Sequence, residues 1–224
     1  FFLNFSRKLI CYSKNLINLP SRINNKLTTI KPLIRKEYYE TIMSQKHDNL
    51  FTIIIIGGSQ GAKIFDELLN KSFASIAKQV SIRIIHQTSE KNINFLKNFY
   101  SENNIESNVF SFDHNLNEVL KKGDLCITRA GASSLAELSF LNIPFVAIPL
   151  PSSKDNHQYE NAKYYKKLDC CWIIDQQNFD DQKFGKFLLE LINKGEDYTM
   201  KKNNLQKLNY QNTWNNVNQK ILKI

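Results

Sequence analysis

A run of apolar residues that ends in closely spaced glycines constrains the fold of this chain more than any other feature. Residues 51–63 read FTIIIIGGSQGAK, a continuous apolar segment followed by a polar turn. Strands buried on both faces of a parallel sheet have this unbroken apolar character. Gly57, Gly58 and Gly61 permit a tight turn and a close approach of the backbone to a ligand. The segment therefore predicts a strand, a turn and a helix of an α/β fold.

The glycine turn is compatible with two roles. A helix that begins directly after it would aim its free N–H groups, at the positive end of the helix dipole, at a ligand, and such an arrangement holds phosphate groups. Many α/β strands, however, end in Gly-Gly only to change direction. The turn alone leaves both interpretations open.

Strand-like and helix-like segments alternate along the rest of the chain. The predicted strands cover residues 51–56, 81–86, 108–112, 125–128, 145–149 and 171–174. The predicted helices cover residues 1–15, 62–78, 90–102, 115–122, 134–141, 157–168, 180–193 and 196–222. This alternation favours an α/β fold with a Rossmann-like, doubly wound parallel sheet.

The composition is that of a soluble globular protein with an excess of positive charge. The formal net charge is +9, from 30 Lys and Arg residues against 21 Asp and Glu residues. Such a charge suits anionic partners, among them phospholipid headgroups and nucleotide diphosphates. We find neither a nucleic-acid-binding motif nor a basic patch interleaved with aromatic residues, so no nucleic-acid partner is predicted.

Cysteine and histidine spacings favour a protein without a metal site. Neither set has the spacing of zinc ligands, and the adjacent cysteines are poorly placed for a bridge, which favours reduced thiols in a cytosolic protein. The residues concerned are Cys11, Cys126, Cys170, Cys171, His47, His86, His114 and His157. No apolar run approaches the about 20 residues that span a bilayer.

Polar or glycine-containing segments follow five of the predicted strands. They are residues 57–61, 86–88, 112–114, 129–132 and the loop that leads to His157 and Gln158. Ligands of doubly wound sheets bind beyond the carboxyl ends of the strands, so these segments predict a ligand site at that edge.

Several common chemistries are excluded by the same segments. The glycine turn is not G-x-G-x-x-G, and no acidic residue ends the next strand, which argues against a dinucleotide dehydrogenase. No Gly-Lys-Ser/Thr follows, so the turn is not a Walker loop, and no G-x-S-x-G elbow supplies a nucleophilic serine.

Five motifs in order resemble the bacterial MurG family of glycosyltransferases. They are GGSQGAK at 57–63, HQ at 86–87, RAGASSLAE at 129–137, NIPFVAIPLP at 142–151 and KDNHQYENA at 154–162. The resemblance implies a GT-B enzyme, in which two Rossmann-like domains face a cleft and the C-terminal domain holds the donor. It implies transfer of N-acetylglucosamine from UDP-N-acetylglucosamine to lipid I, an undecaprenyl-linked acceptor, during lipid II and peptidoglycan synthesis, without a cofactor.

The resemblance also implies a division of the chain and a location. Residues 1–40 would be a remnant of the N-terminal acceptor domain, 41–50 a linker and 51–224 the donor domain, whose last helix packs back toward the N-terminal part. The protein would be cytoplasmic and peripheral on the inner face of the plasma membrane. The basic, aromatic helix expected at 1–15 would either lie on anionic lipid or pack against the acceptor domain.

The phosphate and uracil contacts implied by the resemblance fall on two of these segments. Ser59 and the backbone at Gly58 and Gln60 would hold the diphosphate, although Ser59 would also suit a helix cap. Phe112 would stack on uracil, with the Asp113 backbone reading its edge, although a phenylalanine at a strand end is often a core residue.

The sugar contacts fall on the other segments. Glu137 would accept hydrogen bonds from the ribose hydroxyls, but Ser134 to Glu137 also has the S-x-x-E pattern of a capping box. Gln158 and His157 would contact hydroxyls of the sugar, or face solvent as polar residues of a first turn. Arg129 would pair with a phosphate or brace its loop. The remaining donor contacts implied are Ala132, Ser133, Leu135 and Ala136.

Two departures from the family pattern bear on activity. The stretch TIKPLIR at 29–35 lacks the family's glycine and has an extra residue before Arg35, whose family counterpart reaches the donor. The glycine-rich loop of the family's N-terminal domain is absent, and the expected catalytic base with it. We therefore expect a fragment that binds the donor without transferring sugar alone. Another GT-B enzyme, such as an epimerase, and a non-catalytic interaction module remain alternatives.

Overall fold

A six-stranded parallel sheet forms the centre of the computed structural model, which describes residues 5–12, 20–39, 49–58, 64–208 and 214–223. The strand order is β5-β4-β3-β6-β7-β8. The first strand of this sheet, β3, is central; β4 and β5 follow on one side of it, and β6, β7 and β8 on the other. The strands are β3 (Phe51–Ile56), β4 (Ile82–Gln87), β5 (Glu106–Phe110), β6 (Leu125–Thr128), β7 (Phe145–Ala147) and β8 (Cys171–Ile173). The predicted doubly wound parallel sheet is confirmed.

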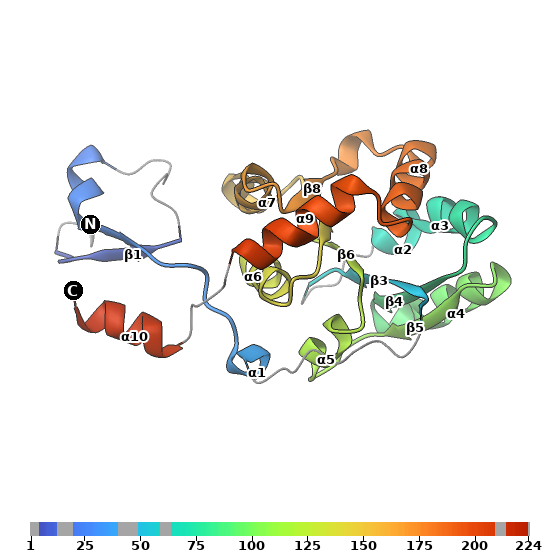
Figure 1. Ribbon diagram of the computed structural model, residues 1–224, viewed down its shortest axis with the longest axis horizontal. Helices are drawn as coiled ribbons and strands as arrows, with labels where there is room; N and C mark the ends of the chain where they lie inside the picture. The colour runs from blue at the N-terminus through green and yellow to red at the C-terminus, as the bar shows by residue number, and fades with distance from the viewer. Residues whose placement is uncertain (1–4, 13–19, 40–48, 59–63, 209–213, 224) are drawn as a thin grey trace.

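Helices pack on both faces of this sheet (Figure 1). They are α2 (Phe65–Leu68), α3 (Asn70–Ala77), α4 (Ile93–Glu102), α5 (Leu116–Leu120), α6 (Ala132–Phe140), α7 (His157–Lys167), α8 (Asp181–Ile192) and α9 (Glu196–Lys207). Short 3₁₀ turns cover η2 (Ser21–Lys26), η3 (Glu90–Asn92), η4 (Lys154–Asn156) and η5 (Gln176–Asn178).

Successive residues of β3 explain the two layers. All six of its residues are buried, and side chains of a strand alternate between its faces. Ile53 and Ile55 belong to the apolar cluster formed with α2, α3, α4 and α8. Ile54 and Ile56 belong to a second cluster, formed with α5, α6 and α7. The apolar run at 51–56 thus contributes side chains to both apolar clusters, one on each face of the sheet.

Some predicted boundaries are wrong. The helix predicted at 62–78 is divided into α2 and α3 around Leu69, and α6 begins two residues earlier than predicted. The single helix predicted at 196–222 is wrong, because α9 ends at Lys207 and α10 (Trp214–Leu222) begins after residues that lie outside the described ranges. Figure 1 shows α10 at the opposite end of the molecule from α3 and α4.

The helix predicted at 1–15 is also wrong where the structure describes it. Leu9–Cys11 form the strand β1, which pairs in parallel with β2 (Leu27–Thr29), so that Leu9 lies opposite Leu27. The Ile30 N–H continues the pairing by donating to the Cys11 carbonyl over 3.0 Å. Apolar periodicity in this segment was outweighed by hydrogen bonds to a partner strand that is distant in sequence.

The segment between β2 and the predicted linker joins the main core. Ile34 and Tyr38, the latter in α1 (Lys36–Tyr39), are each 1% exposed and pack in the second cluster with Ile54. Lys31 Nζ donates to the Leu208 carbonyl at 2.7 Å, which ties the same segment to the end of α9. The division of the chain at 40 and 50 stays a prediction.

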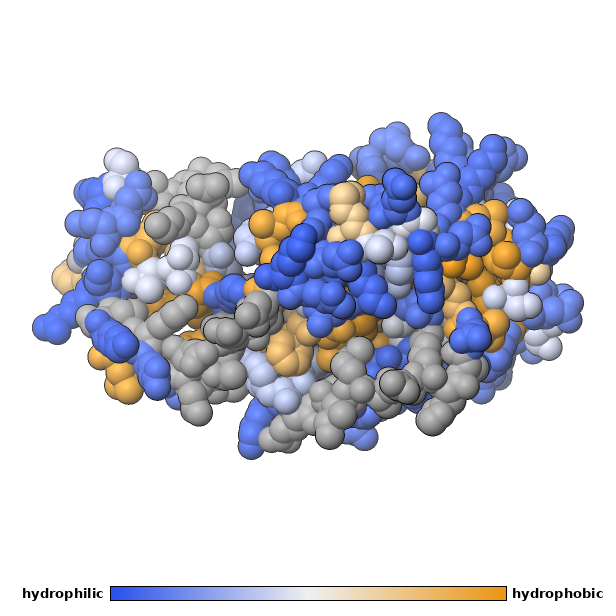
Figure 2. All heavy atoms as spheres, viewed as in Figure 1, coloured by the Kyte–Doolittle hydropathy of each residue, from blue (hydrophilic) through white to orange (hydrophobic). Residues whose placement is uncertain are grey.

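Hydrophilic side chains cover most of the face that carries α9 (Figure 2). All four cysteines are free, and burial raises the pKa of Cys170 to about 11 and that of Cys171 to about 12. Within the described ranges, no helix combines the length and the apolar character needed to cross a membrane.

Candidate functional site

The point where the strand order reverses lies between β3 and β6, and the predicted loops after these two strands begin there. Ile56 of β3 pairs with Thr128 of β6, so Gly57 and Arg129 leave neighbouring strands at the same edge. Gly58 has a φ of +81°, a left-handed conformation that favours glycine, and open space surrounds the position of a Cβ atom. In doubly wound sheets a crevice for ligands opens at this reversal point.

Part of the predicted phosphate turn falls outside the described residues. Ser59, Gln60 and Gly61 belong to this part, so their contacts with a diphosphate and the capping role of Ser59 stay predictions. The chain is described again from Ile64, directly before α2.

A buried carboxylate fixes the start of α2. Asp66 is 1% exposed, and its Oδ2 accepts a hydrogen bond from Thr88 Oγ1 at 2.7 Å and another from Asn92 Nδ2 at 2.5 Å. His86 Nε2 lies 3.3 Å from Asp66 Oδ1, and the other ring nitrogen of His86 lies 2.7 Å from the Tyr100 hydroxyl. The helix after the glycine turn is therefore tied to β4, η3 and α4 by one polar network.

Electrostatics in this network favour an ionised Asp66 and a neutral His86. Burial would raise the pKa of Asp66, but hydrogen bonds from His86, Asn92 and Thr88 outweigh it and hold that pKa below its ordinary value. Burial lowers the pKa of His86 by more than the neighbouring carboxylate raises it. In a neutral ring Nδ1 can accept from the Tyr100 hydroxyl, and Nε2 then carries the hydrogen that faces Asp66 Oδ1 at 3.3 Å.

The network corrects one expectation about the edge. His86 and Thr88, predicted to lie on a polar rim, are buried and face Asp66 instead. The sequence analysis missed Asp66. A carboxylate inside the apolar stripe of the helix predicted at 62–78 was the available signal, because buried carboxylates need polar partners.

Arg35 and Glu137, which the resemblance assigned to the donor, form an ion pair. Arg35 Nε donates to Glu137 Oε1 at 2.9 Å, and Nη2 donates to Oε2 at 3.4 Å. Arg35 Nη2 also donates to the Tyr38 hydroxyl at 2.9 Å, and the guanidinium lies 5.1 Å from the centre of the Tyr38 ring. The hydrogen bond to Glu137 raises the pKa of Arg35 despite partial burial.

The pair is asymmetric in its exposure. The Glu137 side chain is 6% exposed, whereas that of Arg35 is 54% exposed. The extra residue before Arg35 has thus left its side chain within reach of the predicted ribose ligand. Tyr38, which completes the cluster, was missed by the sequence analysis, and burial together with the Glu137 charge raises its pKa.

The start of α6 rules out the capping box. Gly131 is the N-cap residue, so Ser134 lies inside the first turn and Glu137 in the second. The first hydrogen bond of the helix runs from the Leu135 N–H to the Gly131 carbonyl, which leaves the N–H groups of Ala132, Ser133 and Ser134 at the helix terminus. The side chains of Leu135 and Ala136 are buried in the second core cluster. Both residues are fully buried, so the contacts with a donor that the resemblance implies for them stay predictions.

Phe112 lies on the surface and not in the core. Strand β5 ends at Phe110, and the Phe112 side chain two residues later is 70% exposed. Its ring packs edge-on against that of His114, with centroids 4.8 Å apart. Asp113 Oδ1 accepts from the Asn115 N–H at 2.8 Å, an Asx turn that redirects the chain after the strand. The alternative of a core phenylalanine is wrong.

Gln158 and Arg129 both hold the segment after β7. Gln158 Oε1 accepts from the Leu150 N–H at 2.9 Å, so its amide NH₂ is the group left to meet a ligand. Arg129 Nη1 donates to the carbonyls of Ile148 and Pro149, at 2.9 and 3.2 Å, so it joins its own loop to the segment after β7, and its contact with a phosphate stays a prediction. Gln158 is half-buried, and its contact with a ligand stays a prediction, whereas His157 is exposed and its Nδ1 lies 2.7 Å from the Lys154 carbonyl.

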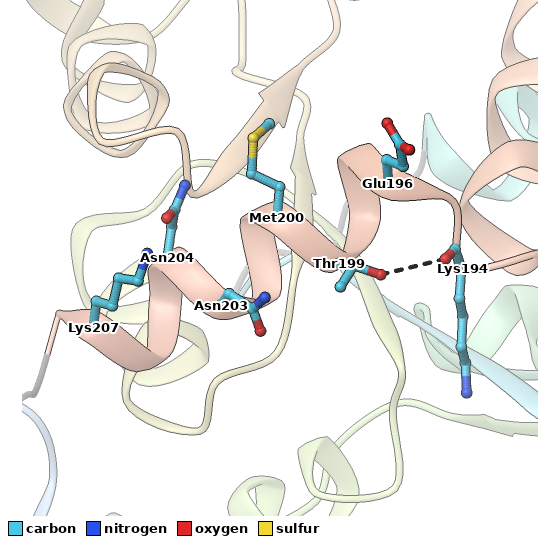
Figure 3. Close-up of a pocket in the computed structure, with 7 residues that line it drawn as sticks. All are labelled: Lys194, Glu196, Thr199, Met200, Asn203, Asn204 and Lys207. Atoms are coloured by element: carbon cyan, nitrogen blue, oxygen red, sulfur yellow. Dashed lines mark hydrogen bonds between the residues drawn. The ribbon is translucent and has the colours of Figure 1, made fainter.

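A hollow of about 430 Å³ lies along α9, apart from these residues (Figure 3). It is lined by Lys194, Glu196, Thr199, Met200, Asn203, Asn204 and Lys207. Figure 3 shows Thr199 Oγ1 donating to the Lys194 carbonyl at the end of the hollow. Six of the seven lining residues belong to one helix, and none is a predicted site residue, so we assign the candidate site to the sheet edge.

Comparison with known proteins identifies the family of this chain. Residues 52–214 match the family described as the glycosyltransferase family 28 C-terminal domain. A crystal structure of Acinetobacter baumannii MurG has the same fold, with a TM-score of 0.67 and 23% sequence identity over 82% of this chain and 53% of that one.

Two curated relatives carry the name UDP-N-acetylglucosamine–N-acetylmuramyl-(pentapeptide) pyrophosphoryl-undecaprenol N-acetylglucosamine transferase. The one from Pelagibacter ubique is 42% identical over all of this chain and 63% of its own length. The one from Rickettsia canadensis is 36% identical over 86% of this chain and 56% of its own length. This chain thus spans less than two thirds of either relative.

These matches confirm the resemblance drawn from the five motifs. They extend it from short segments to the strands and helices that carry them, because the family match covers all six strands of the sheet. The chain belongs to glycosyltransferase family 28, and its residues 52–214 correspond to the C-terminal domain of that family.

Proposed function

We propose that this chain binds UDP-N-acetylglucosamine at the carboxyl edge of the six-stranded sheet. It would form the donor half of an enzyme that transfers N-acetylglucosamine to the undecaprenyl-linked acceptor of lipid II synthesis. The observation that carries the proposal is the buried Glu137 carboxylate in the second turn of α6, beside the point where the strand order reverses. The names of the curated relatives supply the sugar and the acceptor.

Each part of the donor has a chemically suitable group at this edge. The helix terminus at Ala132 to Ser134 offers N–H groups to phosphate, and Glu137 offers oxygens to ribose hydroxyls. The exposed Phe112 ring offers a face on which uracil can stack. The Gln158 amide, whose oxygen is already engaged, can donate to a hydroxyl of the sugar.

The proposed reaction places a definite demand on these groups. The acceptor hydroxyl bonds to C1 of the sugar while the bond from C1 to the diphosphate breaks, and the hydroxyl proton passes to a base. UDP leaves with added negative charge, which helix N–H groups stabilise. The groups described above bind and stabilise UDP, and we assign the base to none of them.

Isothermal titration calorimetry tests the donor specificity. The chain should bind UDP-N-acetylglucosamine more tightly than ADP-ribose or ATP. Glu137→Gln should weaken binding about tenfold, since it replaces a charge-assisted hydrogen bond by a neutral one. Glu118→Gln is the matched control, because Glu118 is exposed and accepts hydrogen bonds from two residues close to it in sequence, Lys121 and Asn117. Equal affinity for ATP would contradict the proposal.

We also propose a peripheral position on the cytoplasmic face of the membrane. The net charge of +9 supports attraction to anionic lipid headgroups. Co-sedimentation with vesicles of phosphatidylglycerol should be strong at low salt and weaker at high salt, because salt screens the attraction. Sedimentation that does not depend on the anionic lipid would contradict it.

A further inference from the structure

We infer that Arg35 is a positioning residue for Glu137: it holds the carboxylate in place for the ribose instead of contacting the diphosphate. This inference rests on the proposed function, because it presumes a nucleotide at the edge of the sheet. It differs from the role that the family resemblance gave to Arg35, which is a direct contact with the donor.

The hydrogen bonds of Arg35 are the first support. Its Nε and Nη2 groups each donate to a different oxygen of Glu137, and Nη2 donates to Tyr38 as well. The two carboxylate oxygens have four lone pairs in all, so the hydrogen bonds from Arg35 and from the Tyr38 hydroxyl still leave room for one from a ribose hydroxyl. The fork of the guanidinium therefore orients the carboxylate without blocking it.

Burial is the second support. The carboxylate is 6% exposed, and a buried charge without a partner is costly. If Arg35 moved away to reach a phosphate, Glu137 would lose its cation at the moment it receives the ribose. The arrangement of lower free energy is the one in which Arg35 stays beside Glu137 when the nucleotide binds.

Anchoring of the Arg35 backbone is the third support. Ile34 and Tyr38 lie on either side of it in sequence and are each 1% exposed in the core. The Tyr38 hydroxyl accepts from Arg35, and its ring lies under the guanidinium at 5.1 Å. The side chain is thus held at its base and at its end.

A double-mutant cycle on Arg35→Ala and Glu137→Gln tests the inference by calorimetry. If Arg35 acts through Glu137, each single variant should weaken UDP binding about tenfold, and the double variant should be little weaker than either single one. The preference for UDP over 2′,3′-dideoxyuridine diphosphate should shrink in all three variants. The preference for UDP over UMP, which reports the outer phosphate, should not change.

Two further variants keep the test informative if Arg35→Ala is unstable. Arg35→Lys keeps the charge but not the fork, so it should lose part of the ribose preference while circular dichroism shows a folded chain. Arg83→Ala with Glu106→Gln is the matched control: this Arg–Glu pair, at 2.6 Å, joins the starts of β4 and β5 at the opposite edge. It should leave UDP binding unchanged.

The outcomes separate the inference from the proposed function. Additive losses, together with a reduced preference for UDP over UMP in Arg35→Ala and Arg35→Lys, would overturn the positioning role and indicate a phosphate contact. A wild-type chain that does not bind UDP at all would overturn the proposed function itself.

Discussion

Removal of the Asp66 carboxylate should destabilise the folded chain strongly. In Asp66→Ala, the Thr88 hydroxyl and the His86 ring nitrogen stay buried and lose the group that faces them. A buried polar group left without a partner costs about 1–3 kcal/mol, so the two together predict a loss of about 2–6 kcal/mol. That is a large part of the about 5–15 kcal/mol by which domains are stable. Urea titration followed by circular dichroism measures the loss.

Two companion variants make this prediction specific to the network. Asp66→Asn keeps an oxygen for Thr88 and should cost about 1 kcal/mol, because the neutral His86 ring can carry its hydrogen on Nδ1 and accept from the new NH₂ group at Nε2. Glu67→Ala, at the exposed next position of the same helix, should change the free energy of unfolding by less than about 0.5 kcal/mol. If Asp66→Ala costs no more than Glu67→Ala, the buried carboxylate does not anchor α2 and the reasoning is wrong.

Three further predictions follow from burial and space. Burial lowers the pKa of His86, so the unfolded chain binds a proton at a pH where the folded chain does not. The free energy of unfolding should therefore be highest above about pH 6.5 and fall as the pH drops, and the fall should be smaller in His86→Gln. Phe112→Ala should weaken UDP binding about tenfold without changing urea stability, since the ring is exposed. Gly123→Ala should destabilise the fold by about 1–3 kcal/mol in urea titrations, because its Cβ would lie 2.5 Å from Ile54 Cδ1, whereas Gly185→Ala, with 4.0 Å to its nearest neighbour, should not. Equal effects of the two glycine variants, a flat pH profile or an unchanged affinity of Phe112→Ala would contradict the respective reasoning.

The central sheet was predictable because its strands carry their own signal. The runs at 51–56 and 125–128 were predicted at their observed bounds, since strands covered on both faces are apolar at every position. The five motifs could also be identified, in their order along the chain, from the sequence. The edge on which they meet follows from the parallel topology alone.

The site was only partly predictable, because its contacts join distant parts of the chain. Arg35 and Glu137 are 102 positions apart, and no local pattern states that they pair. Ser134 has the spacing of a cap, yet the helix starts at Ala132 because tertiary packing of Leu135 and Ala136 decides its bounds. The strand β1 was missed for the same reason, since its partner β2 starts at Leu27.

The packing of Ile34 and Tyr38 has a consequence for where this domain begins. The family match starts at residue 52, but the physical unit starts earlier, because both side chains fill the core beneath Ile54. A shorter chain cut at the family boundary would expose that part of the core and would also lack the cation beside Glu137. One short segment therefore contributes both to the core, through Ile34 and Tyr38, and to the surroundings of Glu137, through Arg35.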